Sequence, residues 1–234
     1  DVIPPMSCIL HIETSTQVCS VALSQDGVCL FDKADFEGPS HAAILAGYVE
    51  EAISFADSHA IPLDAVAVSK GPGSYTGLRI GVSEAKGVAY GRDARLLAVN
   101  SLKVLTVPTL LHAELPDNAL LVPMIDARRM EVYCAVYNRA LQEVWPTQAL
   151  VVDEASFGEL LAEHPLYFMG NGSDKCRAVI QHPHAHFIEG AVPLAKQMIP
   201  LAEMAMAREE FEDVAYFEPF YLKEFVATQS KKLI

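Results

Sequence analysis

The chain has 234 residues, of which 51% are hydrophobic and 20% charged, so it can bury a sizeable core and is not an intrinsically disordered chain. Its formal charge of −13 argues against tight nucleic-acid binding by this chain alone, because an acidic surface repels phosphate backbones. Its longest purely apolar runs fall far short of the roughly 20 residues that span a bilayer. The five cysteines lack C-x-x-C spacing and no secretory leader is evident, so we expect free, buried thiols and a cytoplasmic location.

Strand and helix patterns alternate through the first half of the chain. Apolar runs bounded by turn residues predict strands at residues 8–12, 18–24, 28–32, 65–69 and 96–99. Asp26-Gly27 predicts a tight hairpin turn between the second and third strands. Helices are expected up to about Ser58, with Ser40 as N-cap, and again from Leu78 to Tyr90. This order predicts a mixed sheet with helices packed against it.

A second unit begins in the same way as the first. This unit has an apolar strand at residues 119–125, a polar turn and a strand at residues 131–137. The start of the chain has the same order, and in both places an acidic residue, Glu13 in the first unit, ends the first strand of the hairpin. We therefore expect a duplicated α/β fold, with an N-terminal lobe at residues 1–106 and a C-terminal lobe at residues 107–234. Further on we expect a strand at residues 167–169, a helix at 193–211 and an aromatic segment at 217–225.

The most informative stretch is residues 71–81, GPGSYTGLRIG. A strand, a glycine-rich turn and a helix in this order can present backbone N–H groups to an anion. However, the spacing of Gly71, Gly73 and Gly77 is one residue longer than the dinucleotide fingerprint, and no Gly-Lys-Ser/Thr follows. On physical grounds a tight corner is favoured over a nucleotide site, with the glycines letting backbones approach one another.

The polar turn after the first strand is a second place where a phosphate could be held. The hydroxyl and N–H groups of Thr14 and Ser15, together with Gly73 and Ser74, can lie near a phosphate or can simply cap the turn. Without further context the turn is favoured.

Three alternating histidines, His182, His184 and His186, suggest a metal site. Pro183 interrupts them, however, and no H-E-x-x-H motif is present, so a loop is favoured and no metal is expected.

Two helices carry more apolar or small residues than a surface helix needs. The first has one stripe made of Ala42, Leu45, Val49, Ile53 and Ala56, and a second made of His41, Ile44, Tyr48 and Phe55. The second helix has a ridge of small residues at Gly77, Gly81, Ala85 and Ala89. Since one apolar face suffices to cover a sheet, the second stripe and the ridge predict a face that docks onto another protein; the alternative is that both helices are buried in a larger core.

Motifs along nearly the whole chain resemble those of the bacterial TsaB (YeaZ) family. The matching segments are residues 9–16, residues 19–23, His41, residues 71–81 with Tyr75, residues 126–128, residues 131–133 and residues 219–223. Glu13 stands where the family usually has Asp, and Lys223 where it usually has Arg.

This resemblance implies the two-lobed actin/sugar-kinase/Hsp70-like ATPase fold. It also implies a non-catalytic, dimerising subunit that supports the transferase TsaD, with TsaE as third subunit, in making threonylcarbamoyladenosine next to the tRNA anticodon. The chain alone would form a homodimer through its N-terminal lobe, and it would bind neither membrane nor, tightly, tRNA. The interface residues implied in this way are His41, Ile44, Tyr48, Phe55, Gly77, Gly81 and Ala85.

The same resemblance bears on cofactors. TsaD carries a metal motif, His-Met-Glu-Gly-His, directly after Val-Asn, whereas here Val99-Asn100 is followed by a segment with Ser101 and Leu105 at the histidine positions. Neither side chain can replace imidazole in a transition-metal site. No cofactor of its own is therefore expected, and binding of ATP or ADP at the interface with TsaD stays open.

Two other classes of function stay open. An ATPase or small-molecule kinase of the same fold would approach phosphates with glycine-containing loops in both lobes, but residues 13–16 contain no glycine. A glycoprotease-like peptidase is weakened because no G-x-S-x-G elbow surrounds a serine. Nucleotide turnover by the isolated chain would favour the first class, and partner cleavage that survives metal chelation the second.

Overall fold

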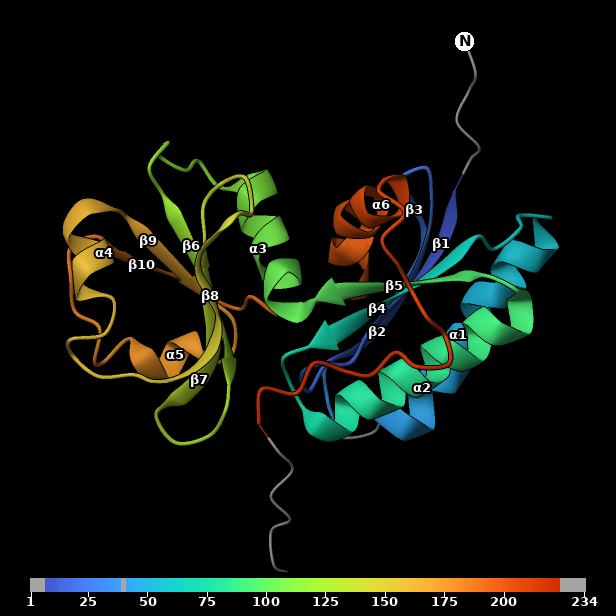
Figure 1. Ribbon diagram of the computed structural model, residues 1–234, viewed down its shortest axis with the longest axis horizontal. Helices are drawn as coiled ribbons and strands as arrows, with labels where there is room; N and C mark the ends of the chain where they lie inside the picture. Colours follow the sequence, from blue (N-terminus) through green and yellow to red (C-terminus); the bar gives the residue numbers. More distant parts are fainter. Residues whose placement is uncertain (1–6, 39–40, 224–234) are drawn as a thin grey trace, which may run out of the picture.

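The computed structural model describes residues 7–38 and 41–223, which form two lobes, each built on one mixed sheet (Figure 1). The first sheet has the order β11-β5-β4-β1-β2-β3. Strands β1 (Cys8–Glu13), β2 (Cys19–Gln25) and β3 (Val28–Asp35) form an antiparallel meander. Strands β4 (Ala65–Gly71) and β5 (Arg95–Asn100) continue the sheet in parallel beyond β1.

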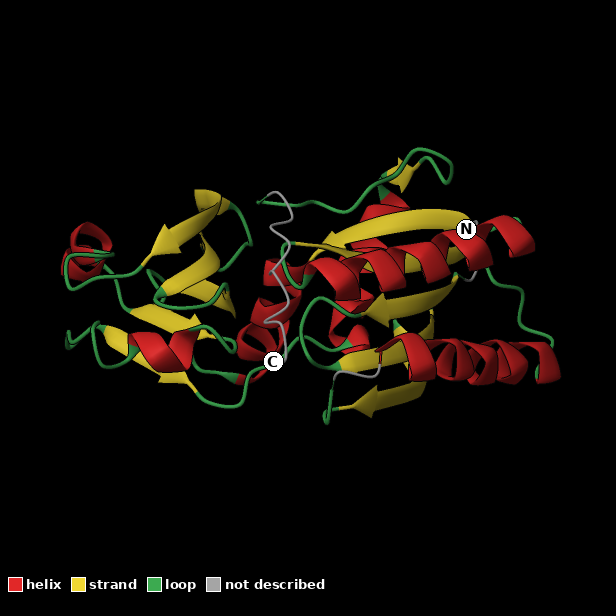
Figure 2. Cartoon of the chain, turned by 90° about the horizontal axis from the view of Figure 1, so that it is seen from below, coloured by secondary structure: helices red, strands yellow, loops and turns green. Residues whose placement is uncertain are grey.

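Helices cover both faces of the first sheet. Helices α1 (His41–Ser58) and α2 (Tyr75–Arg92) lie on the lower face in Figure 1 and in front of the strands in Figure 2. The 3-10 turn η1 (Ala195–Met198) and helix α6 (Ile199–Ala207) cover the opposite face. Because side chains alternate along a strand, Leu10 and Ile12 of β1 pack toward α1 and α2, while Ile9 packs toward α6.

The second lobe repeats the first. Its sheet has the order β10-β9-β6-β7-β8, in which β6 (Leu120–Asp126), β7 (Glu131–Tyr137) and β8 (Glu143–Val151) are antiparallel, while β9 (Leu166–Met169) and β10 (Ala185–Ile188) run parallel to β6. Helix α3 (Ser101–His112) links the lobes, and α4 (Gly158–Glu163) and α5 (Ser173–Cys176) belong to the second. Matching strand orders confirm the duplicated fold predicted from the two hairpins.

The end of the chain differs from the expected second lobe at residues 107–234. The short strand β11 (Phe211–Glu212) pairs antiparallel with β5 of the first sheet, and η1 and α6 pack on that sheet as well. The apolar face formed by Ile9, Ala67 and Leu97 needs such a cover, to which α3 adds Val104, whereas α1 and α2 pack on the opposite face.

Local details also correct the expected elements. The helix expected at residues 193–211 is shorter, because Pro200 stands at the start of α6 and Glu209 adopts a left-handed φ of 56° after its end. Helix α2 begins before Leu78, since the Ser74 side chain caps it by accepting from Gly77 N at 3.2 Å. The expected strands are otherwise found, while Ser40 and the end of the aromatic segment lie outside the described residues.

All five cysteines are free, but only four are buried, because Cys29 is exposed on β3. Burial raises the pKa of Cys19 and of Cys134 to about 12, so these two thiols stay protonated at neutral pH. Within residues 7–38 and 41–223, no helix combines the length and apolarity needed to cross a membrane.

His11 is a fully buried histidine on the same face of β1 as Ile9. Its Nε2 lies 2.7 Å from Ser24 Oγ, and its Nδ1 has no partner in the described part of the chain. Burial lowers the pKa of His11 to about 3, so the folded chain holds a neutral imidazole.

Acidification should therefore weaken the fold through His11. The unfolded side chain binds a proton below about pH 6.5 and the folded one does not, so stability falls by about 1.4 kcal/mol per pH unit below that point. Between pH 7.5 and 5.0, urea unfolding should show wild type losing about 2 kcal/mol more than His11→Gln. His112→Gln, at an exposed position, should behave like wild type. Equal losses in wild type and His11→Gln would contradict this account.

Candidate functional site

The glycine loop between β4 and α2 lies directly on the β1–β2 turn. Ser74 N donates a hydrogen bond to Ser15 O at 2.7 Å. A Cβ added to Gly73 would stand only 2.2 Å from the same Ser15 oxygen, so only glycine permits this approach. The tight corner favoured from the sequence is confirmed.

The first turns of α2 also pack against this β1–β2 turn. A Cβ on Gly77 would lie 2.1 Å from Thr14 O, and one on Gly81 would lie 2.2 Å from Thr14 Oγ1. Thr14 Oγ1 donates to Gly77 O at 2.8 Å, and Ala85 is completely buried. The small-residue ridge of Gly77, Gly81 and Ala85 is therefore used inside the chain, and the prediction that it meets a partner is corrected.

The four residues predicted near a phosphate contact one another instead. Thr14 and Ser15 are fully buried, and Gly73 touches Ser15 without a gap. Because Ser74 N–H already donates to Ser15 O, this N–H group is not free to bind a phosphate in this arrangement.

Glu13 ties the β1–β2 turn to β4. Its Oε1 accepts from Ser15 N at 2.6 Å and from Ser69 Oγ at 3.0 Å, whereas Oε2 has no partner among the described residues. Burial raises the pKa of the Glu13 carboxyl, outweighing the hydrogen bonds that lower it. The carboxyl has no exposed surface, so its role is structural.

Ser101 and Leu105, the two positions for which the family resemblance implied a comparison with metal-binding histidines, lie at the junction between the lobes. Ser101 Oγ accepts from Gly71 N at 3.2 Å, and a Cβ on Gly170 would lie 3.0 Å from Leu105 Cδ1. Both side chains are buried. A lone hydroxyl and a methyl group do not fit a metal ion.

The three alternating histidines are likewise engaged in local contacts. His184 Nδ1 lies 2.8 Å from Leu161 O, and the His186 ring stacks on Tyr167 with centroids 4.8 Å apart. The described part of the chain contains no cluster of three or more His, Cys, Asp or Glu side chains suited to a metal.

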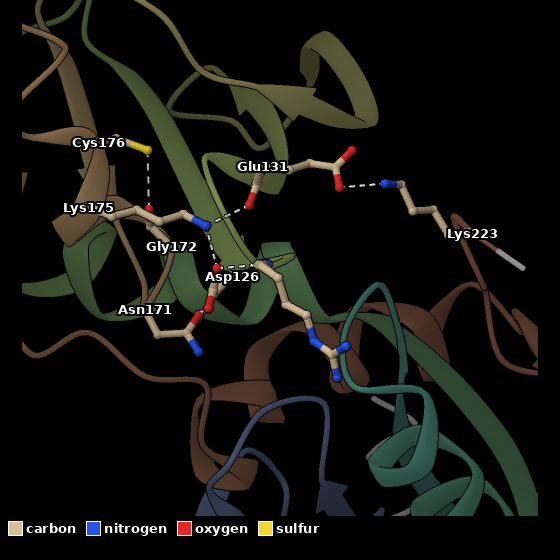
Figure 3. A network of polar contacts seen from close by, with 8 residues as sticks. Asp126, Glu131, Asn171, Gly172, Lys175, Cys176 and Lys223 are labelled. Atoms are coloured by element: carbon tan, nitrogen blue, oxygen red, sulfur yellow. Dashed lines mark hydrogen bonds and ion pairs between the residues drawn. The ribbon is translucent and has the colours of Figure 1, made fainter. Parts of the chain in front are cut away.

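Residues 217–223 join the two lobes at their junction. Phe220 N donates to Lys70 O at 2.7 Å, and the Tyr221 ring lies 4.7 Å from the ring of Tyr75. Lys223 forms an ion pair with Glu131 of β7, as Figure 3 shows. Three motifs that lie far apart in the sequence thus meet at one place, which their spacing along the chain does not reveal.

Helix α1 buries only part of the expected stripe, because Ala42 is exposed and Ile53 is half-buried, and it uses its second stripe differently from the prediction. Leu45 and Val49 are buried, as predicted. His41 is also buried, with Nε2 3.2 Å from Val18 O, so it belongs to the chain's own core and not to a docking face.

The remaining members of the second stripe lie beside β3. Ile44, Tyr48 and Phe55 are half-buried against the first-lobe core. The Lys33 ammonium lies 5.4 Å from the centre of the Tyr48 ring, and Phe55 lies 6.4 Å from Phe31. These side chains are candidates for the edge of a docking face.

The outer surfaces of α1 and α2 carry a set of exposed small residues that sequence reasoning missed. Among the described residues, and apart from the helix's own backbone, no atom lies within 4 Å of the Cβ positions of Gly47, Gly87 and Gly91. The Arg92–Asp57 pair, at 2.8 and 2.9 Å, links the C-terminal ends of the two helices. We call the following set the small-residue face: Ala42, Ala43, Ala46, Gly47, Gly87 and Gly91, all exposed.

Comparisons with known proteins identify the family. The family model described as TsaD, tRNA N6-adenosine threonylcarbamoyltransferase, matches residues 37–231. The Bacillus subtilis tRNA threonylcarbamoyladenosine biosynthesis protein TsaB is 31% identical over 223 residues, covering 92% of this chain and 93% of that protein. The Escherichia coli protein of the same name is 30% identical over 231 residues, covering 94% and 96%. YeaZ from Pseudomonas aeruginosa superimposes with a TM-score of 0.79 at 26% identity, covering 93% of this chain and all of that chain.

These matches span nearly the whole chain and agree with the two-lobed fold that the resemblance implied. The chain belongs to the TsaB (YeaZ) family.

Two glycines of α2 should respond oppositely to the same substitution. Gly77→Ala places a methyl group on the Thr14 carbonyl and should destabilise the chain by at least about 2 kcal/mol. Gly87→Ala meets open space and should stabilise it by about 0.5–1 kcal/mol, because alanine favours the helix. Urea unfolding of both variants measures the difference. Equal effects at the two positions would show that α2 does not rest on the β1–β2 turn as described.

Proposed function

We propose that this chain is a non-catalytic subunit that binds TsaD and supports transfer of threonylcarbamoyl to the adenosine next to the tRNA anticodon. Its curated relatives carry the name tRNA threonylcarbamoyladenosine biosynthesis protein TsaB. Membership of this family supports a role in threonylcarbamoyladenosine biosynthesis, and within that biosynthesis we propose that the chain binds TsaD.

The absence of a catalytic role is argued from the site chemistry. The metal positions of the transferase are taken here by Ser101 and Leu105, which offer no imidazole. The β1–β2 turn and the glycine loop are bonded to each other through Ser15 and Ser74. In this proposal any ATP or ADP is bound at the interface with TsaD and not in this chain's own loop.

The observation that carries the docking role is the small-residue face. Glycine within a helix costs about 1 kcal/mol relative to alanine, and no neighbour within residues 7–38 and 41–223 requires glycine at position 47 or 87. Small residues on a helix surface let a second backbone approach closely. Ile53 of α1 and Val88 of α2 are half-buried and add apolar surface to this face. Each lies one helical turn before a member of the Asp57–Arg92 ion pair.

This face is suited to the equivalent helices of TsaD, since the family model of that transferase matches this chain and implies a related fold. Without TsaD the same face would pair with a second copy, giving a symmetric homodimer. TsaE would join the assembled pair. At a net charge of −13 the chain alone would hold tRNA weakly, and the complex would supply the remaining basic surface.

Gly87→Arg and Gly47→Arg test the docking role. Each adds a large charged side chain at the centre of the proposed interface without a clash inside the chain. Each should abolish the homodimer in gel filtration and weaken TsaD binding about 30-fold or more, equivalent to about 2 kcal/mol, in calorimetry.

Gly158→Arg is the matched control. Gly158 also has open space around its Cβ position, but it lies at the start of α4 in the second lobe. This variant should dimerise and bind TsaD as wild type does. Normal association of the Gly47 and Gly87 variants, with Gly158→Arg impaired, would move the interface to the second lobe.

A further inference from the structure

The hairpin turn between β6 and β7 has an unusual backbone. Arg128 and Arg129 adopt left-handed φ values of 73° and 52°. Asp126 Oδ1 accepts from Arg128 N at 3.0 Å, and Glu131 N donates to Arg128 O at 3.1 Å, which fixes the turn. Asn171 Oδ1 accepts from Asp126 N at 3.0 Å and braces it from the neighbouring loop.

Arginine is a poor choice for this conformation. Left-handed residues are usually Gly, Asn or Asp, because a larger side chain crowds the backbone there. Among the described residues, Arg128 and Arg129 are the only consecutive non-glycine pair with positive φ. Strain kept in the backbone points to a function for the side chains that impose it.

The two guanidinium groups are exposed and uncompensated. Of the lysines and arginines that the structure describes, only Lys70, Arg128 and Arg129 have side chains without an ion pair, a hydrogen bond or an aromatic contact. Both arginines are exposed.

The acidic residues flanking the turn do not neutralise these arginines. Asp126 forms an ion pair with Lys175, and Glu131 forms one with Lys223 (Figure 3). Lys175 also donates to Glu131 O at 2.7 Å. The hairpin and the two lysines bound to it therefore carry four cations and two carboxylates, in a chain whose net charge is −13.

We propose that Arg128 and Arg129 bind phosphate groups of the RNA backbone when the chain is part of its complex. This inference rests on the proposed function, which supplies tRNA as the nucleic acid. Guanidinium groups suit phosphate oxygens, with which they form paired hydrogen bonds. An exposed hairpin tip fits an extended polyanion better than a free nucleotide, which is normally held in a pocket that covers most of its surface.

Equilibrium tRNA binding to the complex of this chain with TsaD and TsaE, between 50 and 200 mM salt, tests the inference. Arg128→Gln/Arg129→Gln should weaken tRNA binding about tenfold and lower the slope of log affinity against log salt by about 1.4–1.8. The control Arg139→Gln/Arg177→Gln removes the same charge from arginines paired with Asp117 and Glu189, and it should leave both quantities unchanged.

A second double variant separates phosphate binding from a structural role. Arg128→Asn/Arg129→Gly relieves the left-handed backbone, so it should raise Tm by about 2–4 °C while weakening tRNA binding as the glutamine variant does. A lower Tm together with unchanged tRNA binding would show that the arginines only shape the turn.

The remaining outcomes are distinguishable. Wild type that fails to assemble with TsaD overturns the proposed function. A complex that assembles but binds no tRNA, or binds it equally with both glutamine variants, overturns this inference alone. Loss of ATP binding with tRNA binding retained would assign the phosphate to a nucleotide and would also overturn it.

Discussion

The structure depends on the close approach of α2 to the β1–β2 turn. Gly73 and Gly77 allow backbone-to-backbone contact with Ser15 and Thr14 at distances that no side chain would permit. This contact fixes where α2 crosses the sheet, and it engages the Ser74 N–H group of the glycine loop. It also decides which face of α2 is left outside, namely the one with Gly87. The glycine motif at residues 71–81, whose pattern resembles that of a ligand-binding loop, thus positions the outer surface of α2.

The C-terminal segment adds a second constraint, because it connects lobes that otherwise meet mainly through α3. Lys86 Nζ donates to the carbonyl oxygens of Ala215 and Phe217, holding the segment along α2 as it runs toward the second lobe (Figure 1). The ion pair of Lys223 with Glu131 then anchors its end in that lobe. This arrangement gives a physical reason for the C-terminal motif: it holds the first-lobe helices and the β6–β7 hairpin in a fixed relation.

Much of the fold could be predicted because strand periodicity and turn residues are local signals. The Asp26-Gly27 hairpin and the repeated β–turn–β unit were recognisable from residue type alone. The small-residue face could not be predicted, because Gly77 and Gly87 are the same residue type on the same helix and differ only in what surrounds them. One faces Thr14 and the other faces open space, which depends on the rotation of α2 about its axis. The return of β11 to the first sheet also escaped prediction, since a pairing over more than 100 residues leaves no local pattern.

The central claim is that the outer surfaces of α1 and α2 bind TsaD. Amide hydrogen exchange tests this claim most directly. It is measured first on a monomeric form of this chain, such as Gly87→Arg, and then on the wild-type chain with TsaD added. The account predicts slower exchange on binding in residues 41–58 and 75–92, beyond that of the free monomer, with no change in β8 or α4. Protection confined to the second lobe, with α1 and α2 exchanging as in the free monomer, would contradict it.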